Sequence, residues 1–261
     1  VNAASMRAIE NAPPAEPELM QHAPHAHPTP NTQTHRMLRG RPLIALVGPG
    51  DNGGDALIMA RALAQAGATV TCWASRDRED DPLVHSACRA GARWRIWSGN
   101  TRSLRRDVLA ATSVVDGLLG IGSNLPLRGS VAEILEVLPP LEGQPRVAID
   151  IPTGVDPDSG TTDVNAFRAT TTLATGPIKI GTLLHPGIDH AGLVEALDIG
   201  LGQEIAASGA PQLITAQTVE PVVPVRSLES HKGTFGTVLI LGGSTSYHGA
   251  PALAALAAHG S

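Results

Sequence analysis

The sequence has few aromatic residues, no excess of positive charge and no long apolar run. Phe, Trp and Tyr make up 2% of the 261 residues, too few for extended base-stacking surfaces of the RNA-binding kind. The formal net charge of −5 gives no general attraction to nucleic acid or to anionic membranes. No apolar run approaches the ~20 residues that span a bilayer. These absences predict a cytoplasmic, soluble protein that binds neither nucleic acid nor membrane.

Cysteine is also scarce, and no metal-binding spacing occurs. Cys72 and Cys88 are the two cysteines, and we expect both to be reduced thiols. His22, His25 and His27 lie in or beside the proline-rich segment 23–35, which we expect to be a loop after a short helix at 4–12. Without a regular scaffold, these histidines favour a solvated tract over a metal site.

What the sequence does contain is a repeated alternation of short apolar runs and longer stretches with helical spacing. The helical stretches include 55–65, 82–90 and 130–138. Strands that alternate with helices form right-handed crossovers and a largely parallel sheet. The pattern predicts an α/β fold, a Rossmann-like three-layer αβα sandwich. Its expected strands are 43–47, 68–73, 93–97, 112–116, 146–150, 170–174 and 193–199.

The alternation of strand-like and helix-like segments ends after this region. Residues 205–229 are weakly patterned and rich in proline, so we interpret them as a connector between a domain at 1–204 and a tail at 230–261. The tail predicts one strand within 236–243, a glycine turn and a helix. One strand and one helix cannot form a core, so we expect an incomplete C-terminal α/β fragment.

Three strand ends carry polar, acid-containing turns. "GPGDNGGDAL" follows the first strand, Asp116 ends the fourth, and Asp150 ends the fifth. Ligands bind beyond the carboxyl ends of strands in open α/β sheets, so these turns can meet in one crevice. Either acid alone could simply cap a turn. Three such turns in one sheet favour a binding site.

The glycine-rich turn departs from the dinucleotide-binding fingerprint. Gly48, Gly50 and Gly53 match its spacing, but no acid ends strand 68–73 to hold a ribose, which disfavours a dinucleotide-dependent oxidoreductase. The glycines instead favour backbone amides that reach a phosphate, with Asp55 near the start of a helix. Asn52 and the acids supply oxygen atoms that suit a hard cation.

These motifs in combination resemble a known family. "GPGDNGGDAL", "DGLLGIG" and "AIDIPTGVDPDSG" look like the YjeF N-terminal domain, the NAD(P)H-hydrate epimerase family, over roughly residues 3 to 200. The tail "GTFGTVLILGGSTSYHGAPALAALAA" is similar to the start of the ADP- or ATP-dependent NAD(P)H-hydrate dehydratase, a ribokinase-like module. Because most of that module is missing here, dehydratase activity is not expected from this sequence.

The resemblance implies epimerisation of the R and S hydrates of NADH and NADPH (NADHX and NADPHX), a homodimer, and coupling to a dehydratase. It implies potassium held by Asn52, Asp116 and Thr153, with Asp116 and Asp150 as the catalytic acids, whose separate roles the sequence does not assign. Lys179 matches a family segment and is interpreted either as a phosphate ligand or as a surface lysine. Implied substrate contacts are Asp51, Asn52, Gly53, Gly54, Asp55, Gly120, Ile121, Gly122, Ser123, Asn124, Leu125, Pro126 and Asp150.

Some positions depart from the family pattern. Asp51 stands where the family usually has Asn, and a carboxylate there repels a diphosphate. Thr153 replaces the usual Ser but keeps the hydroxyl, Ala56 replaces Gly, and the arginine of the substrate loop is displaced to Arg128. These changes keep open a second hypothesis, a non-catalytic nucleotide-binding or dimerisation module on the same fold.

Overall fold

The structure is a computed structural model that describes residues 37–139, 143–197, 199, 211–223, 225, 227–231, 233–234 and 236–260. The helix predicted at 4–12, the loop predicted at 23–35 and the histidine tract lie outside this range. The chain divides into two units, Val1–Pro211 and Gln212–Ser261. Each unit is described by itself.

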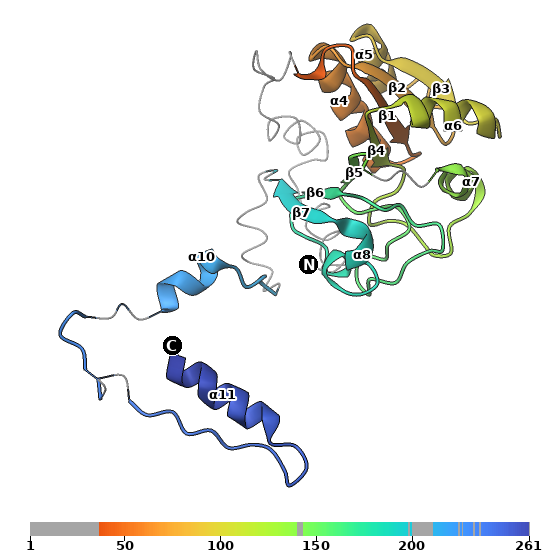
Figure 1. Ribbon diagram of the computed structural model, residues 1–261. Helices are drawn as coiled ribbons and strands as arrows, with labels where there is room; N and C mark the ends of the chain where they lie inside the picture. The colour runs from red at the N-terminus through yellow and green to blue at the C-terminus, as the bar shows by residue number, and fades with distance from the viewer. Residues whose placement is uncertain are drawn as a thin grey trace, which may run out of the picture. The chain divides into compact units, whose positions relative to one another are not determined.

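The first unit is built on a seven-stranded sheet in the order β3-β2-β1-β4-β5-β6-β7 (Figure 1). Every strand pair in it is parallel, which confirms the predicted α/β fold. The inner strands are apolar on both faces because helices cover both sides of the sheet. The strands are β1 (Pro42–Val47), β2 (Thr69–Ala74), β3 (Arg93–Ile96), β4 (Ser113–Gly117), β5 (Arg146–Ile149), β6 (Thr171–Thr175) and β7 (Leu193–Leu197).

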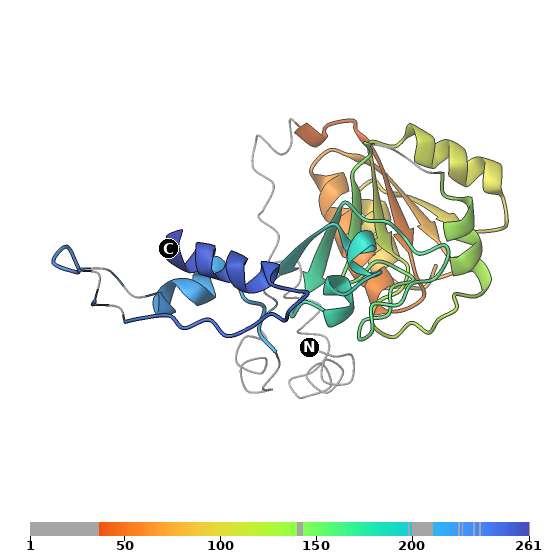
Figure 2. The same ribbon diagram turned by 60° about the horizontal axis from the view of Figure 1, so that its bottom comes forward.

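Helices pack on both faces of the sheet and complete three layers (Figure 2). Helices α4 (Asp51–Gln65) and α5 (Pro82–Arg89) contribute Leu57 and Val84 to one apolar core. Helices α6 (Thr101–Ala110) and α7 (Gly129–Val137) contribute Leu104 and Ile134 to the other. Short helices η2 (Ile180–Leu183) and α8 (Ile188–Ala191) follow β6. Among the helices that the structure describes, none has the length and apolar character to cross a membrane.

Helix α4 begins at Asp51, four residues before the predicted start at Asp55. The amides of Gly53 and Gly54 both donate to the carbonyl of Gly50, at 3.1 and 3.3 Å. The sequence pattern places Gly53 in the turn before the helix, but here Gly53 and Gly54 belong to the first helical turn. A side chain at Gly53 would lie 2.2 Å from the carbonyl oxygen of Gly48, so only glycine permits this tight entry into the helix.

The order of the strands places the ligand crevice expected of an open α/β sheet at the carboxyl ends of β1 and β4. From β1 the chain builds outward through β2 and β3, then returns to place β4 on the other side of β1. This is the topological switch point at which ligands bind in open α/β sheets. Bare backbone lets the two loops approach here, because a Cβ on Gly48 would lie 1.5 Å from the carbonyl oxygen of Leu118.

The second unit contains α10 (Ala216–Val219), η3 (Glu220–Val222) and α11 (Gly249–Gly260). The helix predicted in the tail is therefore confirmed. The strand predicted within 236–243 is wrong, since these residues pair with no strand in the described part of the chain. A β-strand needs a hydrogen-bonded neighbour, and Val238, Leu239 and Leu241 are exposed instead of packed.

Candidate functional site

Three loops meet at the switch point, as the sequence predicts. A Cβ on Gly117, at the end of β4, would lie 2.8 Å from the backbone oxygen of Asn52 in the first turn of α4. A Cβ on Gly120 would lie 3.5 Å both from Cβ of Asn52 and from Oδ2 of Asp150. Gly120, in the loop after β4, therefore lies close to both the start of α4 after β1 and the loop after β5.

Asp116 is enclosed completely, with no exposed surface. Oδ1 accepts from the amide of Leu118 at 3.1 Å and from Oγ1 of Thr153 at 2.8 Å, while Oδ2 accepts from the amide of Thr153 at 2.8 Å. Burial raises the pKa of the Asp116 carboxyl from 3.8 to about 6, and these hydrogen bonds oppose the rise. Asp116 is thus a buried carboxylate with a fixed orientation.

Thr153 joins the β5 loop to the β4 loop. Besides its bonds to Asp116, its hydroxyl accepts from the amide of Leu119 at 3.0 Å. Only 1% of Thr153 is exposed. The hydroxyl oxygen therefore lies next to the Asp116 carboxylate and beside the backbone that leads to Gly120.

Asn52 is buried without a hydrogen-bond partner. Its side-chain Oδ1 and Nδ2 are both inaccessible and neither is paired among the described residues. An unsatisfied buried amide costs about 1–3 kcal/mol, so such a group indicates a missing ligand or a water. Carboxylate, hydroxyl and amide oxygens together are the donors that hard cations prefer. Asn52, Asp116 and Thr153 therefore fit the potassium set that the family resemblance implies.

Within the described ranges, the usual side-chain ligands of transition metals do not form a cluster. His, Cys, Asp and Glu side chains there do not gather in groups of three or more that could hold a metal ion. A potassium site built from one carboxylate, one amide and one hydroxyl falls outside that description.

Asp150 has the backbone conformation of a functional turn. Its φ of 67° lies in the left-handed region, which non-glycine residues seldom adopt. The amide of Asp150 donates to Leu173 at 2.7 Å, and its Oδ1 accepts from Oγ1 of Thr175 at 2.7 Å. Hydrogen bonds from the described residues reach Oδ1, while Oδ2 lies towards Gly120.

Lys179 is not a surface lysine, and its ammonium group is not free to bind a phosphate. Only 1% of its side chain is exposed, and Nζ forms an ion pair with Oδ1 of Asp150. Nζ also donates to the carbonyl of Thr175 at 3.0 Å. The interpretation of Lys179 as a surface lysine is therefore wrong, because packing buries it against an acid 29 residues earlier.

The predicted substrate loop, Gly120 to Pro126, is partly exposed and lies after β4. Its far end is fixed by Asp163, whose Oδ2 accepts from the amide of Leu127 at 2.9 Å. The predicted contacts Asp51 and Asp55 both lie on α4, Asp51 exposed and Asp55 half-buried. No side chain caps the N-terminus of α4.

Arg78, in the loop after β2, is a site neighbour that the sequence analysis missed. Its Nη1 donates to the carbonyls of Gly48 at 2.8 Å and Gly50 at 2.9 Å, while its Nε donates to Asp81 at 3.0 Å. Asp81 in turn caps α5 by accepting from Leu83. The Asp-Pro start of α5 is the sequence signal that could have located this anchor.

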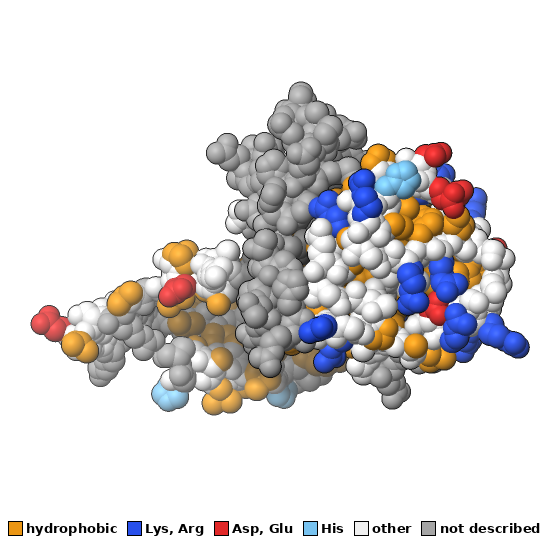
Figure 3. All heavy atoms as spheres, turned by 90° about the horizontal axis from the view of Figure 1, so that it is seen from above, with side chains coloured by type: hydrophobic (Ala, Val, Ile, Leu, Met, Phe, Trp, Pro, Cys, Tyr) orange, Lys and Arg blue, Asp and Glu red, His pale blue; other side chains and the backbone are white. Residues whose placement is uncertain are grey.

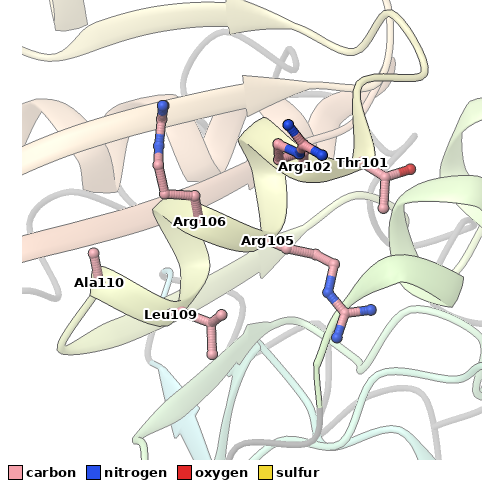
Figure 4. A pocket seen from close by; sticks show the side chains of 6 residues that line it. All are labelled: Thr101, Arg102, Arg105, Arg106, Leu109 and Ala110. Carbon is pink, nitrogen blue, oxygen red and sulfur yellow. The ribbon is translucent and has the colours of Figure 1, made fainter.

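A hollow lies beside α6 and contains none of these residues. It measures about 820 Å³ and is lined by Thr101, Arg102, Arg105, Arg106, Leu109 and Ala110 (Figure 4). The three arginines point in different directions in this view, so their charges do not converge on one anion. Figure 3 shows basic side chains dispersed among apolar and acidic ones on the face seen from above. The crevice remains the better candidate.

Comparison with known proteins places the sequence among relatives of named activity. The family model described as "YjeF-related protein N-terminus" matches residues 16–181. The sequence is 32% identical over 227 residues to the "Bifunctional NAD(P)H-hydrate repair enzyme Nnr" of Moorella thermoacetica, covering 84% of this chain and 43% of that protein. It is 38% identical over 162 residues to the "NAD(P)H-hydrate epimerase" of Microbacterium testaceum, covering 61% of this chain and 62% of that protein. The chain thus spans less than two thirds of either relative.

A solved structure supports the fold. The crystal structure of the yeast protein ynu0 (YNL200c) superposes with a TM-score of 0.54 and 18% sequence identity, covering 75% of this chain and 86% of that chain. At this identity the likeness concerns the fold alone.

Proposed function

The chain belongs to the YjeF-related N-terminal family, and we propose that it interconverts the R and S hydrates of NADH and NADPH. The named relatives support this activity. The observation that carries it is the meeting of Asn52 and Asp150 at Gly120. There the side chain of Asn52, whose amide is buried and unpaired, and the Oδ2 atom of Asp150 both lie near Gly120, an arrangement that suits a cation-assisted acid–base site.

Potassium is the proposed cofactor, held by Asn52, Asp116 and Thr153. The ion would supply positive charge beside a substrate that carries a diphosphate and a hydroxyl group. It would also offset the burial of Asp116, whose carboxyl has its pKa raised to about 6 by desolvation. The three side chains would provide the oxygens, and hydrogen bonds between Asp116 and Thr153 hold two of them in place.

The two catalytic acids then have different roles. Inversion at a hydroxyl-bearing carbon next to a ring nitrogen requires the C–O bond to break and re-form, or the ring to open and close. Either route needs a group that gives up a proton and takes one back. We assign this role to Oδ2 of Asp150, which faces Gly120. Asp116 is fully enclosed, and its contribution is to hold the cation.

The substrate would lie between the start of α4 and the loop after β4. The first backbone amides of α4, those of Asp51 and Asn52, suit a phosphate, because no side chain caps this helix N-terminus. The loop from Gly120 to Pro126 would enclose the nicotinamide, held at its end by Asp163. Asp51 is exposed, so its carboxylate can turn away from a diphosphate.

The alternative is a non-catalytic nucleotide-binding or dimerisation module on the same fold, and the departure of Asp51 from the family pattern, which counts against full activity, favours it. We also propose a domain at 1–204, a connector at 205–229 and part of a dehydratase module at 230–261. A homodimer, a cytoplasmic location and coupling to a dehydratase are also proposed from the family resemblance.

The test uses a mixture of R and S hydrates of NADH with a separate S-specific dehydratase, with and without potassium. The dehydratase alone leaves the R form to its spontaneous epimerisation. We expect this protein to speed the loss of the R form, and potassium to increase the rate. Loss of the R form at the spontaneous rate with folded protein would overturn the proposal and favour the binding module.

The cation site has a readout that does not depend on activity. Potassium should raise the thermal midpoint of the wild-type protein because it binds the folded state. Asn52→Leu has no amide oxygen, and its midpoint should no longer respond to potassium. An equal response in this variant would remove Asn52 from the ligand set.

A further inference from the structure

Lys179 is one of the largest fully buried side chains of the described chain. It follows β6, and its ammonium group reaches Asp150 and the carbonyl of Thr175. Lysine is almost never fully buried unless it is paired, because burial of an isolated charge is unfavourable. The partner of Lys179 is Asp150, the acid that we place at the reacting carbon, so the pair is a candidate for a functional role.

The end of β6 holds Asp150 at two points. The Asp150 amide donates to the carbonyl of Leu173 at 2.7 Å, which fixes the backbone at its unusual φ of 67°. Thr175 and Lys179 then both donate to Oδ1 of the carboxylate. Both side-chain donors reach the same oxygen, and the other oxygen, Oδ2, is the one that lies towards Gly120.

This arrangement differs from an ion pair that serves stability alone. A buried pair is often no more stabilising than apolar side chains of the same volume. The pair here sits at the edge of the crevice, on the residue that occupies a strained conformation. Strain of this kind persists only where surrounding contacts enforce it, and it gathers at functional sites.

We propose that Lys179 is a positioning residue that holds Asp150 through Oδ1, so that Oδ2 faces the reacting carbon of the bound hydrate. This rests on the proposed epimerase function. Lys179 does not touch the substrate, because its ammonium group is occupied by Asp150 and Thr175. Its contribution is to the orientation and charge of the carboxylate that does.

The kinetic test compares Lys179→Met with Thr175→Val. Lys179→Met keeps an unbranched side chain, one atom shorter, but loses the charge and both hydrogen bonds. We expect kcat to fall about 10²-fold, the effect of misplacing a catalytic group by about 1 Å, with KM within twofold. Thr175→Val removes the neutral donor to the same oxygen, and its kcat should fall less than about 10-fold.

A crystal structure of the Lys179→Met variant beside the wild type gives a readout independent of activity. We expect the Asp150 carboxylate to turn away from Gly120 in the variant. An unchanged carboxylate, or an unchanged kcat, would overturn the proposal. If Lys179→Met does not fold, Lys179→Gln, which keeps a neutral N–H donor, decides by the same two measurements. A wild-type protein without epimerase activity would overturn the proposed function instead, while the crystal structures would still decide the positioning of Asp150.

Discussion

Thr153 donates to both oxygens of Asp116, through its hydroxyl to Oδ1 and through its amide to Oδ2, each at 2.8 Å. One residue of the β5 loop thus fixes the carboxylate that ends β4. The hydroxyl bond also orients Thr153. Because the hydroxyl proton points to Asp116, the directions of the lone pairs on the hydroxyl oxygen are set as well. A cation bound next to the two residues would be coordinated by carboxylate and hydroxyl oxygens whose positions are already fixed.

Thr153→Val tests this coupling, with Thr153→Ser as its control. Valine has the shape of threonine but leaves Oδ1 of Asp116 without its hydroxyl donor. We expect the free energy of unfolding in potassium-free buffer to fall by about 1–3 kcal/mol. Serine keeps the hydroxyl, so Thr153→Ser should retain both the stability and the potassium requirement.

The measurements for Thr153 are urea unfolding and the potassium concentration that gives half-maximal epimerase activity. That concentration should rise at least 10-fold in Thr153→Val, as is usual when a ligand or its direct support is lost. If Thr153→Val keeps the wild-type potassium dependence, Thr153 is not a ligand.

Gly120→Ala adds a methyl group at the centre of the site. The new Cβ would lie 3.5 Å from Cβ of Asn52 and from Oδ2 of Asp150, ordinary contact distances. Stability should therefore be kept or rise by up to about 1 kcal/mol, while kcat/KM falls about 10-fold or more as the methyl occupies substrate space. Gly249→Ala, whose Cβ would also meet nothing within 4 Å and which lies in the second unit, is the control and should remain active. Equal activity of both variants would place the substrate elsewhere.

Arg78→Met should loosen the glycine-rich turn. The variant loses the hydrogen bonds to the carbonyls of Gly48 and Gly50 and to Asp81. We expect the free energy of unfolding to fall by about 1–3 kcal/mol, and KM for the hydrate to rise because the start of α4 is no longer fixed. Arg76→Met, an exposed neighbour, should change neither quantity. A loss of stability with unchanged KM would make Arg78 a purely structural anchor.

The framework of the site follows from local patterns in the sequence. Apolar runs of strand length alternate with helical stretches, and Asp116 and Asp150 directly follow two of these runs, so their meeting at one edge could be predicted. The start of α4 could not, because Gly53 and Gly54 are favourable in turns and become helical only where Gly48 approaches them.

The partners of Lys179 and Arg78 also required the structure. Lys179 and Asp150 are 29 residues apart in the sequence, and Arg78 and Gly48 are 30 apart. Only the packing of the strands brings such distant residues together. The predicted strand within 236–243 failed for the opposite reason. Its local β propensity is high, but a strand also needs a neighbour, which the described part of the second unit does not supply.

Asp116 gives the protein a pH dependence whose sign can be worked out. Its pKa is about 6 in the folded state because of burial, against 3.8 ordinarily. Between these values the folded protein keeps a proton that the unfolded chain has lost, so the contribution of Asp116 to stability falls as pH rises from about 4 to 6. The shift corresponds to about 3 kcal/mol at most, and above about pH 6 the effect is constant.

The contribution of Asp116 to the free energy of unfolding can be isolated by urea unfolding in potassium-free buffer. The wild type and Asp116→Asn are compared at pH 4.5 and pH 7.5. The asparagine does not titrate, so the stability of the wild type relative to the variant should be lower at pH 7.5 than at pH 4.5. Potassium at pH 7.5 should restore the wild type, because the cation binds the ionised carboxylate in the folded state, and should leave Asp116→Asn little changed. A relative stability that rises with pH in potassium-free buffer would mean that the fold already stabilises the charged form, and that Asp116 needs no cation.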